Sequence, residues 1–119
     1  MAVFEAFDVV VVPFPFTDRA AAKRRPALVL SRWEAFGERI GHGVLAMITS
    51  AANPPWPLDV AIDDLDAAGL PAPSVVRMKL FTLDFRLILR TVGRLALADR
   101  MRVQAALGEL LGMGAETYS

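Results

Sequence analysis

Basic side chains gather in two parts of this sequence. The 119 residues include 13 Lys or Arg and 13 Asp or Glu, so the formal net charge at pH 7 is zero. The charges are nevertheless uneven along the chain. The first basic segment is opposed only by Asp18 and the second only by Asp84. Their members are Arg19, Lys23, Arg24, Arg25, Arg32, Arg77, Lys79, Arg86, Arg90 and Arg94. Because arginine keeps its proton up to about pH 12, these side chains can stabilise negative charge but are poor bases.

Several of these residues also have an ordinary structural explanation. Arg25 precedes a proline at the start of an apolar run, where an arginine is usually a solvated surface charge. Thr49 and Ser50 follow another apolar run, where hydroxyl side chains usually stabilise a turn. Arg77 and Lys79 alternate along one predicted strand and therefore share a face. A solvated sheet surface explains that pair as well as a ligand contact does.

The candidate metal ligands are few and poorly spaced. His42 lies between two glycines, where we expect a turn tip. With no second histidine and no cysteine, it cannot form a zinc site or a two-histidine nuclease by itself. Four aspartates lack the order and the terminal glutamate of a calcium loop, so we expect a solvated acidic loop. They are Asp59, Asp63, Asp64 and Asp66. The sequence thus predicts no metal site and implies no cofactor.

Short apolar runs separated by proline and glycine predict a mainly β fold. The predicted strands cover residues 9–12, 27–30, 44–48, 58–62, 75–79 and 88–95. Six short strands indicate a small barrel or sandwich. The polar, basic segment 14–25 connects the first two strands and is the kind of loop that carries function. Residues 32–43 mix aromatic residues with glycine, which predicts an irregular excursion with room for one helical turn.

The last part of the chain changes to a helical period. Val103, Leu107 and Leu110 recur at i, i+4 and i+7 with charged residues between them. This spacing predicts an amphipathic helix that begins near residues 98–99 and ends at Gly112.

Composition bounds the class of protein. The length suits a single domain covering residues 1–119. Hydrophobic residues make up 55% of the chain, yet the longest apolar run, residues 9–16, contains two prolines and is too short to cross a membrane. So much apolar surface in a small domain predicts an exposed patch and a homodimer. The absence of cysteine and of a basic leader predicts a cytoplasmic protein.

Four sequence blocks, taken in order, resemble a known family. The chain is similar to the MazF/PemK toxins of bacterial toxin-antitoxin systems in residues 8–31, 48–50, 74–77 and 81–84. The resemblance implies an SH3-like β-barrel with a C-terminal helix and a homodimer. It also implies a sequence-specific endoribonuclease that inhibits translation, and an antitoxin whose flexible tail covers the active site.

The same resemblance implies which residues act on RNA. It places the catalytic arginine at Arg25 and the catalytic threonine at Thr49. Residues implied to bind RNA are Thr17, Lys23, Arg24, Ser50, Arg77 and Lys79. Metal-independent cleavage lets the RNA 2′-hydroxyl attack the neighbouring phosphate, and fixed donors such as Arg25 then stabilise the charge that develops. The general base remains unassigned.

The sequence departs from the family pattern at three places. Phe7 stands where relatives commonly have glycine, and Lys79 stands where one branch has aspartate. Residues 19–23 offer neither the acid nor the imidazole found in the better-known toxins. This altered loop keeps a second hypothesis open, a non-catalytic barrel that binds a protein target, as a gyrase-directed toxin of similar fold does, or a degenerate regulator. The loop aromatics Trp33, Phe36 and Trp56 could stack bases, cap the barrel or line a dimer interface.

Overall fold

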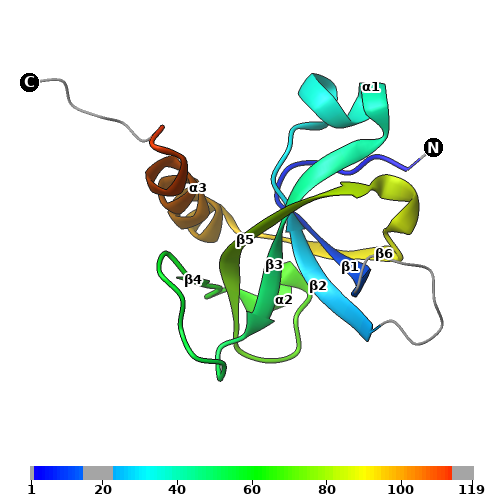
Figure 1. Ribbon diagram of the computed structural model, residues 1–119. Coiled ribbons are helices and arrows are strands. Elements are labelled where there is room, and N and C mark those ends of the chain that lie inside the picture. The colour runs from blue at the N-terminus through cyan, green and yellow to red at the C-terminus, as the bar shows by residue number, and fades with distance from the viewer. Residues whose placement is uncertain (1, 15–22, 114–119) are drawn as a thin grey trace, which may run out of the picture.

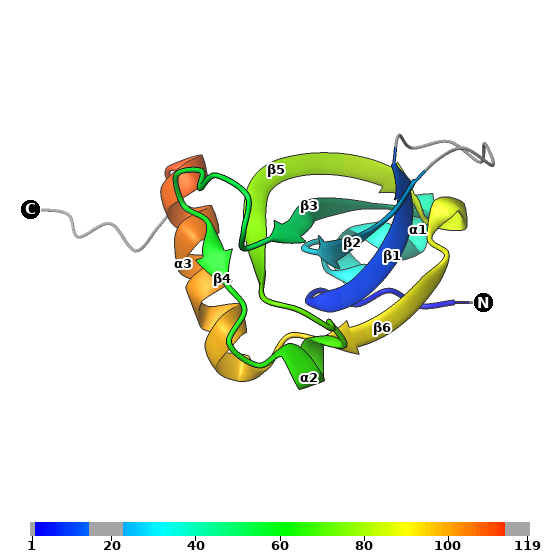
Figure 2. The same cartoon turned by 90° about the horizontal axis from the view of Figure 1, so that it is seen from below.

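The computed structural model describes residues 2–14 and 23–113, and its centre is one curled antiparallel sheet. The spatial order of the strands is β4-β5-β3-β2-β1-β6. Their bounds are β1 (Asp8–Phe14), β2 (Lys23–Val29), β3 (His42–Ser50), β4 (Val60–Ala61), β5 (Ser74–Asp84) and β6 (Arg90–Arg94). Figure 1 shows the sheet curling into a half-barrel, and Figure 2 shows β5 curving around the other strands. The predicted mainly β fold with a C-terminal helix is confirmed.

Within the residues described, five helical segments flank this sheet. They are η1 (Trp33–Gly37), α1 (Glu38–Ile40), α2 (Leu65–Ala68), η2 (Phe85–Leu87) and α3 (Leu97–Leu111). Helix α3 lies beside β4 and β5, and its C-cap, Gly112, adopts the left-handed conformation that ends the helix as predicted. Residues 32–43 differ from the prediction, because η1 and α1 together make this segment helical over most of its length.

Several strand predictions had the wrong bounds, and one turn prediction was wrong. Strand β2 begins at Lys23, four residues before the predicted start, because its pairing with β1 continues to Phe14. Arg25 therefore lies on a strand and not in the predicted connecting segment 14–25. Strand β4 has two residues instead of five, because Leu58 has a positive φ of 66° just before it. Strand β5 has 11 residues, and its register with β3 shifts between Ala46 and Met47, so its side-chain alternation is interrupted. His42 begins β3 opposite Asp84 and does not occupy a turn tip.

Both faces of the sheet are covered, which explains the unbroken apolar run in β1. Val9 belongs to a core cluster that includes Val103 of α3. Its neighbour Val10 belongs to a second cluster with Phe85, on which Trp33 stacks with ring centroids 5.9 Å apart. Neighbouring residues of a strand point to opposite faces, so a strand buried on both sides needs apolar residues at every position.

A buried carboxylate attaches α3 to the chain before α2. Asp99 is 1% exposed and accepts hydrogen bonds from the backbone N–H groups of Asp63 (3.1 Å) and Asp64 (3.0 Å). Arg102 pairs with Asp99 and also with Asp63. The Asp64 side chain in turn accepts from the N–H of Ala67 and caps α2. These contacts modify the prediction of a solvated acidic loop, because the loop folds around an interior carboxylate.

Phe7 adopts a backbone conformation that suits glycine. Its φ is 74°, in a turn where the N–H of Asp8 donates to the carbonyl of Glu5. The Asp8 carboxylate accepts from the Glu5 N–H and pairs with Arg94 at 2.7 Å. A side chain in the left-handed region costs about 1 to 2 kcal/mol, so the glycine-to-Phe7 departure has a conformational cost in this chain.

Within the described part of the chain, no helix is both long enough and apolar enough to cross a membrane.

Candidate active site

The candidate site forms where β2 and β3 part. The last pair of their ladder is Ala27 with Met47. Continuing the same register by two residues places Arg25 of β2 opposite Thr49 of β3. On its other side Arg25 pairs with Val12 of β1. The two predicted catalytic residues therefore come from neighbouring strands, just beyond the last pair of the ladder that joins them.

A cavity of about 220 Å³ opens at this point and receives residues from four strands and one loop. Its lining is Phe14, Arg25, Met47, Ile48, Thr49, Asn53, Trp56, Arg77 and Lys79. Arg25 and Thr49 thus open into one cavity and not onto different sides of the molecule. Three basic side chains line it, so this cavity suits an anionic ligand. Its described lining contains no carboxylate and no imidazole.

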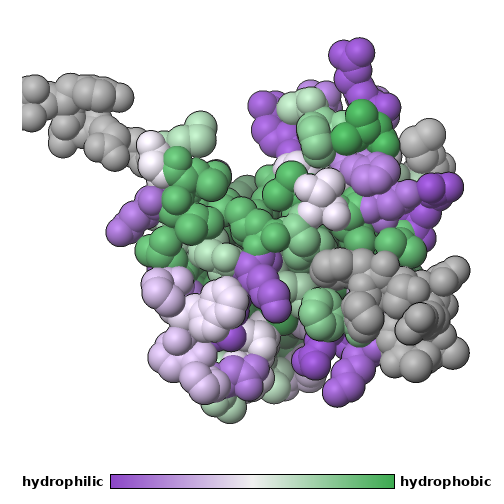
Figure 3. All heavy atoms as spheres, in the orientation of Figure 1, coloured by the Kyte–Doolittle hydropathy of each residue, from purple (hydrophilic) through white to green (hydrophobic). Residues whose placement is uncertain are grey.

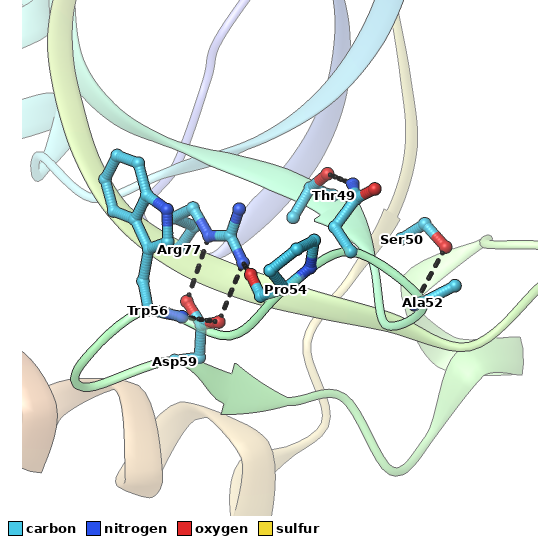
Figure 4. Close-up of polar contacts among 8 residues, drawn as sticks. Thr49, Ser50, Ala52, Pro54, Trp56, Asp59 and Arg77 are labelled. Carbon is cyan, nitrogen blue, oxygen red and sulfur yellow. Dashed lines mark hydrogen bonds and ion pairs between the residues drawn. The ribbon is translucent and has the colours of Figure 1, made fainter.

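The structure places Arg77 in a fixed ion pair. Its Nε donates to Asp59 Oδ1 at 3.2 Å and its Nη2 donates to Asp59 Oδ2 at 2.9 Å, a two-pronged contact shown in Figure 4. The side chains are only 11% and 12% exposed. These hydrogen bonds lower the pKa of Asp59 below its usual value and raise the pKa of Arg77. Asp59 was expected in a solvated loop, and that expectation was wrong because β4 pairs with β5 and brings it to Arg77.

Thr49 and Ser50 have different surroundings despite being neighbours. Asn53 Nδ2 donates to Thr49 Oγ1 at 2.6 Å, which leaves the threonine hydroxyl hydrogen available to a ligand. Ser50 Oγ accepts from the backbone N–H of Ala52 at 3.1 Å and does not line the cavity. The turn-stabilising explanation therefore describes Ser50, whereas Thr49 faces the cavity.

Of the remaining predicted RNA-binding residues that the structure describes, Lys79 lines the cavity and the others do not. The Lys79 Nζ lies 5.5 Å from the centroid of the Phe14 ring. Lys23 and Arg24 are exposed on β2, where they pair with the end of β1, and they do not line the cavity. Thr17 lies outside the described residues.

Sequence reasoning missed the roles of Asn53 and Asp59 and left that of Trp56 open. The Trp56 ring packs over the Arg77 guanidinium, with 4.9 Å from Cζ to the ring centroid. Asp59 is 18 residues from Arg77 in sequence, so no local period could reveal the pair. Asn53 follows Thr49 by four residues in an ordinary turn sequence, and the sequence contains no signal that distinguishes it.

Two further observations concern ligands. Among residues 2–14 and 23–113, no group of three or more His, Cys, Asp or Glu side chains is arranged to hold a metal ion. A larger hollow of about 550 Å³ lies between the N-terminal segment, η1 and η2, but it contains none of the predicted site residues.

Known proteins resemble this chain in sequence and in fold. The profile of the family described as "PemK-like, MazF-like toxin of type II toxin-antitoxin system" matches residues 5–111. A MazE-MazF structure from Deinococcus radiodurans (Form-III) is 28% identical with a TM-score of 0.75, and covers 95% of this chain and 100% of its own. MazF alone from the same organism (Form-I) is 28% identical with a TM-score of 0.73 and the same coverage.

A more distant structure shares the fold. It is an endoribonuclease in complex with its cognate antitoxin from a mycobacterial species, 18% identical with a TM-score of 0.74, and it covers 98% of this chain and 100% of its own. The search of curated protein sequences found no match. Since the family profile spans almost the whole described chain, the chain belongs to the PemK-like, MazF-like toxins of type II toxin-antitoxin systems.

Proposed function

We propose that this toxin is an endoribonuclease that cleaves single-stranded RNA in the cytoplasm at specific sequences and without a metal, and so inhibits translation and growth. The supporting observation is that Arg25 and Thr49, on neighbouring strands, line one cavity with Lys79. A polyanion entering this cavity meets permanent positive charge and a hydroxyl donor. Cleavage of messenger RNA is the activity that this arrangement supports best.

The reaction assigns a separate task to each group. The RNA 2′-oxygen bonds to the adjacent phosphorus while the bond from phosphorus to the 5′-oxygen breaks. The 2′-hydroxyl gives up a proton and the leaving 5′-oxygen takes one. Arg25 stabilises the charge on the phosphoryl oxygens during this exchange, since its guanidinium keeps its charge throughout. Thr49 donates its hydroxyl hydrogen to a phosphate oxygen, and Asn53 fixes the orientation of that hydroxyl.

The experiment is RNA cleavage by purified protein in excess EDTA. The wild type should cut, and Arg25→Ala should lower kcat by about 100-fold or more while keeping its circular dichroism spectrum. Thr49→Val tests the hydroxyl with little change of shape. Arg39→Ala serves as the matched control, because Arg39 is an exposed arginine in α1, away from the cavity. Undiminished cutting by Arg25→Ala, or strict dependence on magnesium, would refute the mechanism.

The surface of α3 supports the proposed protein partners. Leu97 and Met101 are 67% and 60% exposed, and Figure 3 shows hydrophobic side chains gathered over this helix. Such a patch suits a subunit interface. We propose a homodimer, and a cognate antitoxin that binds the toxin as MazE does in the Deinococcus radiodurans complex. Light scattering of the free chain, which should give twice the mass of 12.9 kDa, tests the dimer.

The alternative, a toxin that binds a protein target without cutting RNA, predicts a different result in cells. Expression of the nuclease should arrest growth and fragment RNA, and the Arg25→Ala variant should do neither. Arrest of growth with intact RNA would favour the protein-binding alternative and refute the nuclease.

A further inference from the structure

Three hydrogen bonds hold the segment between β3 and β4 beside the cavity. Asn53 donates to Thr49, the Arg77 Nη2 donates to the carbonyl of Pro54 at 2.9 Å, and the backbone N–H of Trp56 donates to Asp59 Oδ2 at 2.9 Å. One carboxylate therefore accepts from the Arg77 guanidinium and from the backbone of Trp56 at once (Figure 4). This arrangement fixes the place of the Trp56 backbone relative to the cavity.

The Trp56 side chain is held but not covered. Its ring packs over the Arg77 guanidinium, yet the residue remains 45% exposed and lines the cavity together with Thr49. The other tryptophan, Trp33, packs its ring on Phe85 against the second core cluster. An exposed indole beside basic side chains is suited to an unpaired nucleobase, because every base has a flat face that can stack on it.

Arg77 is poorly placed to act as a phosphate ligand. Both its Nε and its Nη2 donate to Asp59, and the 2.9 Å ion pair between Nη2 and Asp59 Oδ2 neutralises its charge. Its side chain is also only 11% exposed. A phosphate would have to compete with this carboxylate in a largely buried position. Arg25 and Lys79 are exposed residues of the same cavity and need no such exchange. Arg25 and Lys79 are thus free to bind a phosphate, whereas Arg77 supports the Trp56 indole.

We propose that Trp56 is the stacking platform for an unpaired base of the RNA substrate, and that Arg77 and Asp59 are positioning residues that hold this platform. The inference rests on the proposed function and adds a specificity element to it. The stacked base lies next to the phosphate that Arg25 and Thr49 contact, since one small cavity is lined by all three side chains.

Tryptophan fluorescence tests the platform without relying on cleavage. In a Trp33→Phe variant, Trp56 is the single remaining tryptophan. The probe is a randomised pool of short single-stranded RNA carrying 2′-O-methyl groups, which cannot be cut by 2′-hydroxyl attack. This pool should quench the Trp56 emission, and an abasic pool of equal length should quench it much less. The Trp56→Phe variant, which reports only Trp33, is the matched control and should show no quenching.

Binding and kinetics measure the size of the effect. Trp56→Ala should weaken binding of the 2′-O-methyl pool by about 5-fold to 150-fold, the range expected for loss of one stacked base. It should raise KM by a similar factor and leave kcat nearly unchanged, because stacking stabilises bound substrate and transition state alike. Trp56→Phe should recover most of the affinity, since the ring is retained.

A double-mutant cycle separates positioning from phosphate binding. Arg77→Lys keeps the charge but loses the two-pronged contact with Asp59. If Arg77 acts through Trp56, Arg77→Lys should weaken binding in the wild type and have almost no further effect in Trp56→Ala. Equal effects of Arg77→Lys in both backgrounds would overturn the positioning role.

Failure of this proposal can be distinguished from failure of the nuclease. If RNA is cut in an Arg25-dependent manner but Trp56→Ala binds and cuts as the wild type does, the platform is wrong and the nuclease stands. The Trp56 surface would then serve another partner, such as an antitoxin. If the chain neither binds the pool nor cuts RNA, both proposals are overturned.

Discussion

Asp99 is the single side chain whose removal should most weaken the attachment of α3. Its buried carboxylate accepts from the backbone N–H groups of Asp63 and Asp64 and pairs with Arg102. Asp99→Ala removes all three contacts at once. The helix contributes Val103 and Ala106 to the first core cluster, so loosening its first turn also weakens that packing.

The expected loss follows from these contacts. A hydrogen bond to a charged group contributes about 1.5 to 3 kcal/mol. We take the lower figure for each backbone donor, because Asp63 and Asp64 are exposed residues and water can reach them after the truncation. Arg102 still donates to the carbonyl of Ala61 and still pairs with the Asp63 carboxylate, so the loss of its contact with Asp99 adds little to the free-energy change. The total is about 3 kcal/mol, which for a domain of this size lowers Tm by about 12 °C.

Thermal and urea unfolding followed by circular dichroism measures this loss. Asp99→Asn should be almost as damaging as Asp99→Ala, because an amide offers one acceptor oxygen where three donors meet. Glu109→Gln is the matched control, since Glu109 is an exposed carboxylate on the same helix, and it should change stability by less than about 0.5 kcal/mol. If Asp99→Ala melts within about 2 °C of Glu109→Gln, the carboxylate does not hold α3 and the reasoning is wrong.

Three further outcomes follow from single contacts. Gly93→Ala should lower the free energy of unfolding by about 1 to 3 kcal/mol or more, because a Cβ there would lie 2.4 Å from the carbonyl oxygen of Ala67. An unchanged stability in urea unfolding would show that α2 can shift away from β6 without cost. The lowered pKa of Asp59 means that its ion pair with Arg77 stabilises the fold above about pH 4 and loses this effect as the pH falls through the folded-state value. The stability gap between wild type and Asp59→Asn should therefore shrink on acidification below about pH 4, and a constant gap would contradict the pairing. In urea unfolding, Phe7→Gly should have a free energy of unfolding about 1 kcal/mol higher than that of Phe7→Ala, because the positive φ at this position favours glycine. The reverse order of stability would show that this turn is unstrained.

The sequence by itself determined the elements whose cause is local. The β-branched run in β1 predicts a strand, and the i, i+4, i+7 spacing of Val103, Leu107 and Leu110 predicts α3, which Gly112 ends. The family resemblance also came from local blocks, and the profile match confirms it. Arg25 and Thr49 were selected on that ground alone, and their catalytic roles stay predictions.

Only the tertiary structure decided which distant groups meet. The Arg77 and Asp59 pair depends on β4 lying beside β5, and the contacts of Asp99 reach residues 35 and 36 positions earlier in the chain. Side-chain periods report which face of an element is buried, but they carry no information on which strand becomes its neighbour or where a register shifts. The free energy of such a pair depends on burial and on geometry that exist only after the sheet has curled. For this reason Trp56 and Asp59 could be read from the sequence only as a loop aromatic and a loop acid, whereas the fold makes them one assembly beside the cavity.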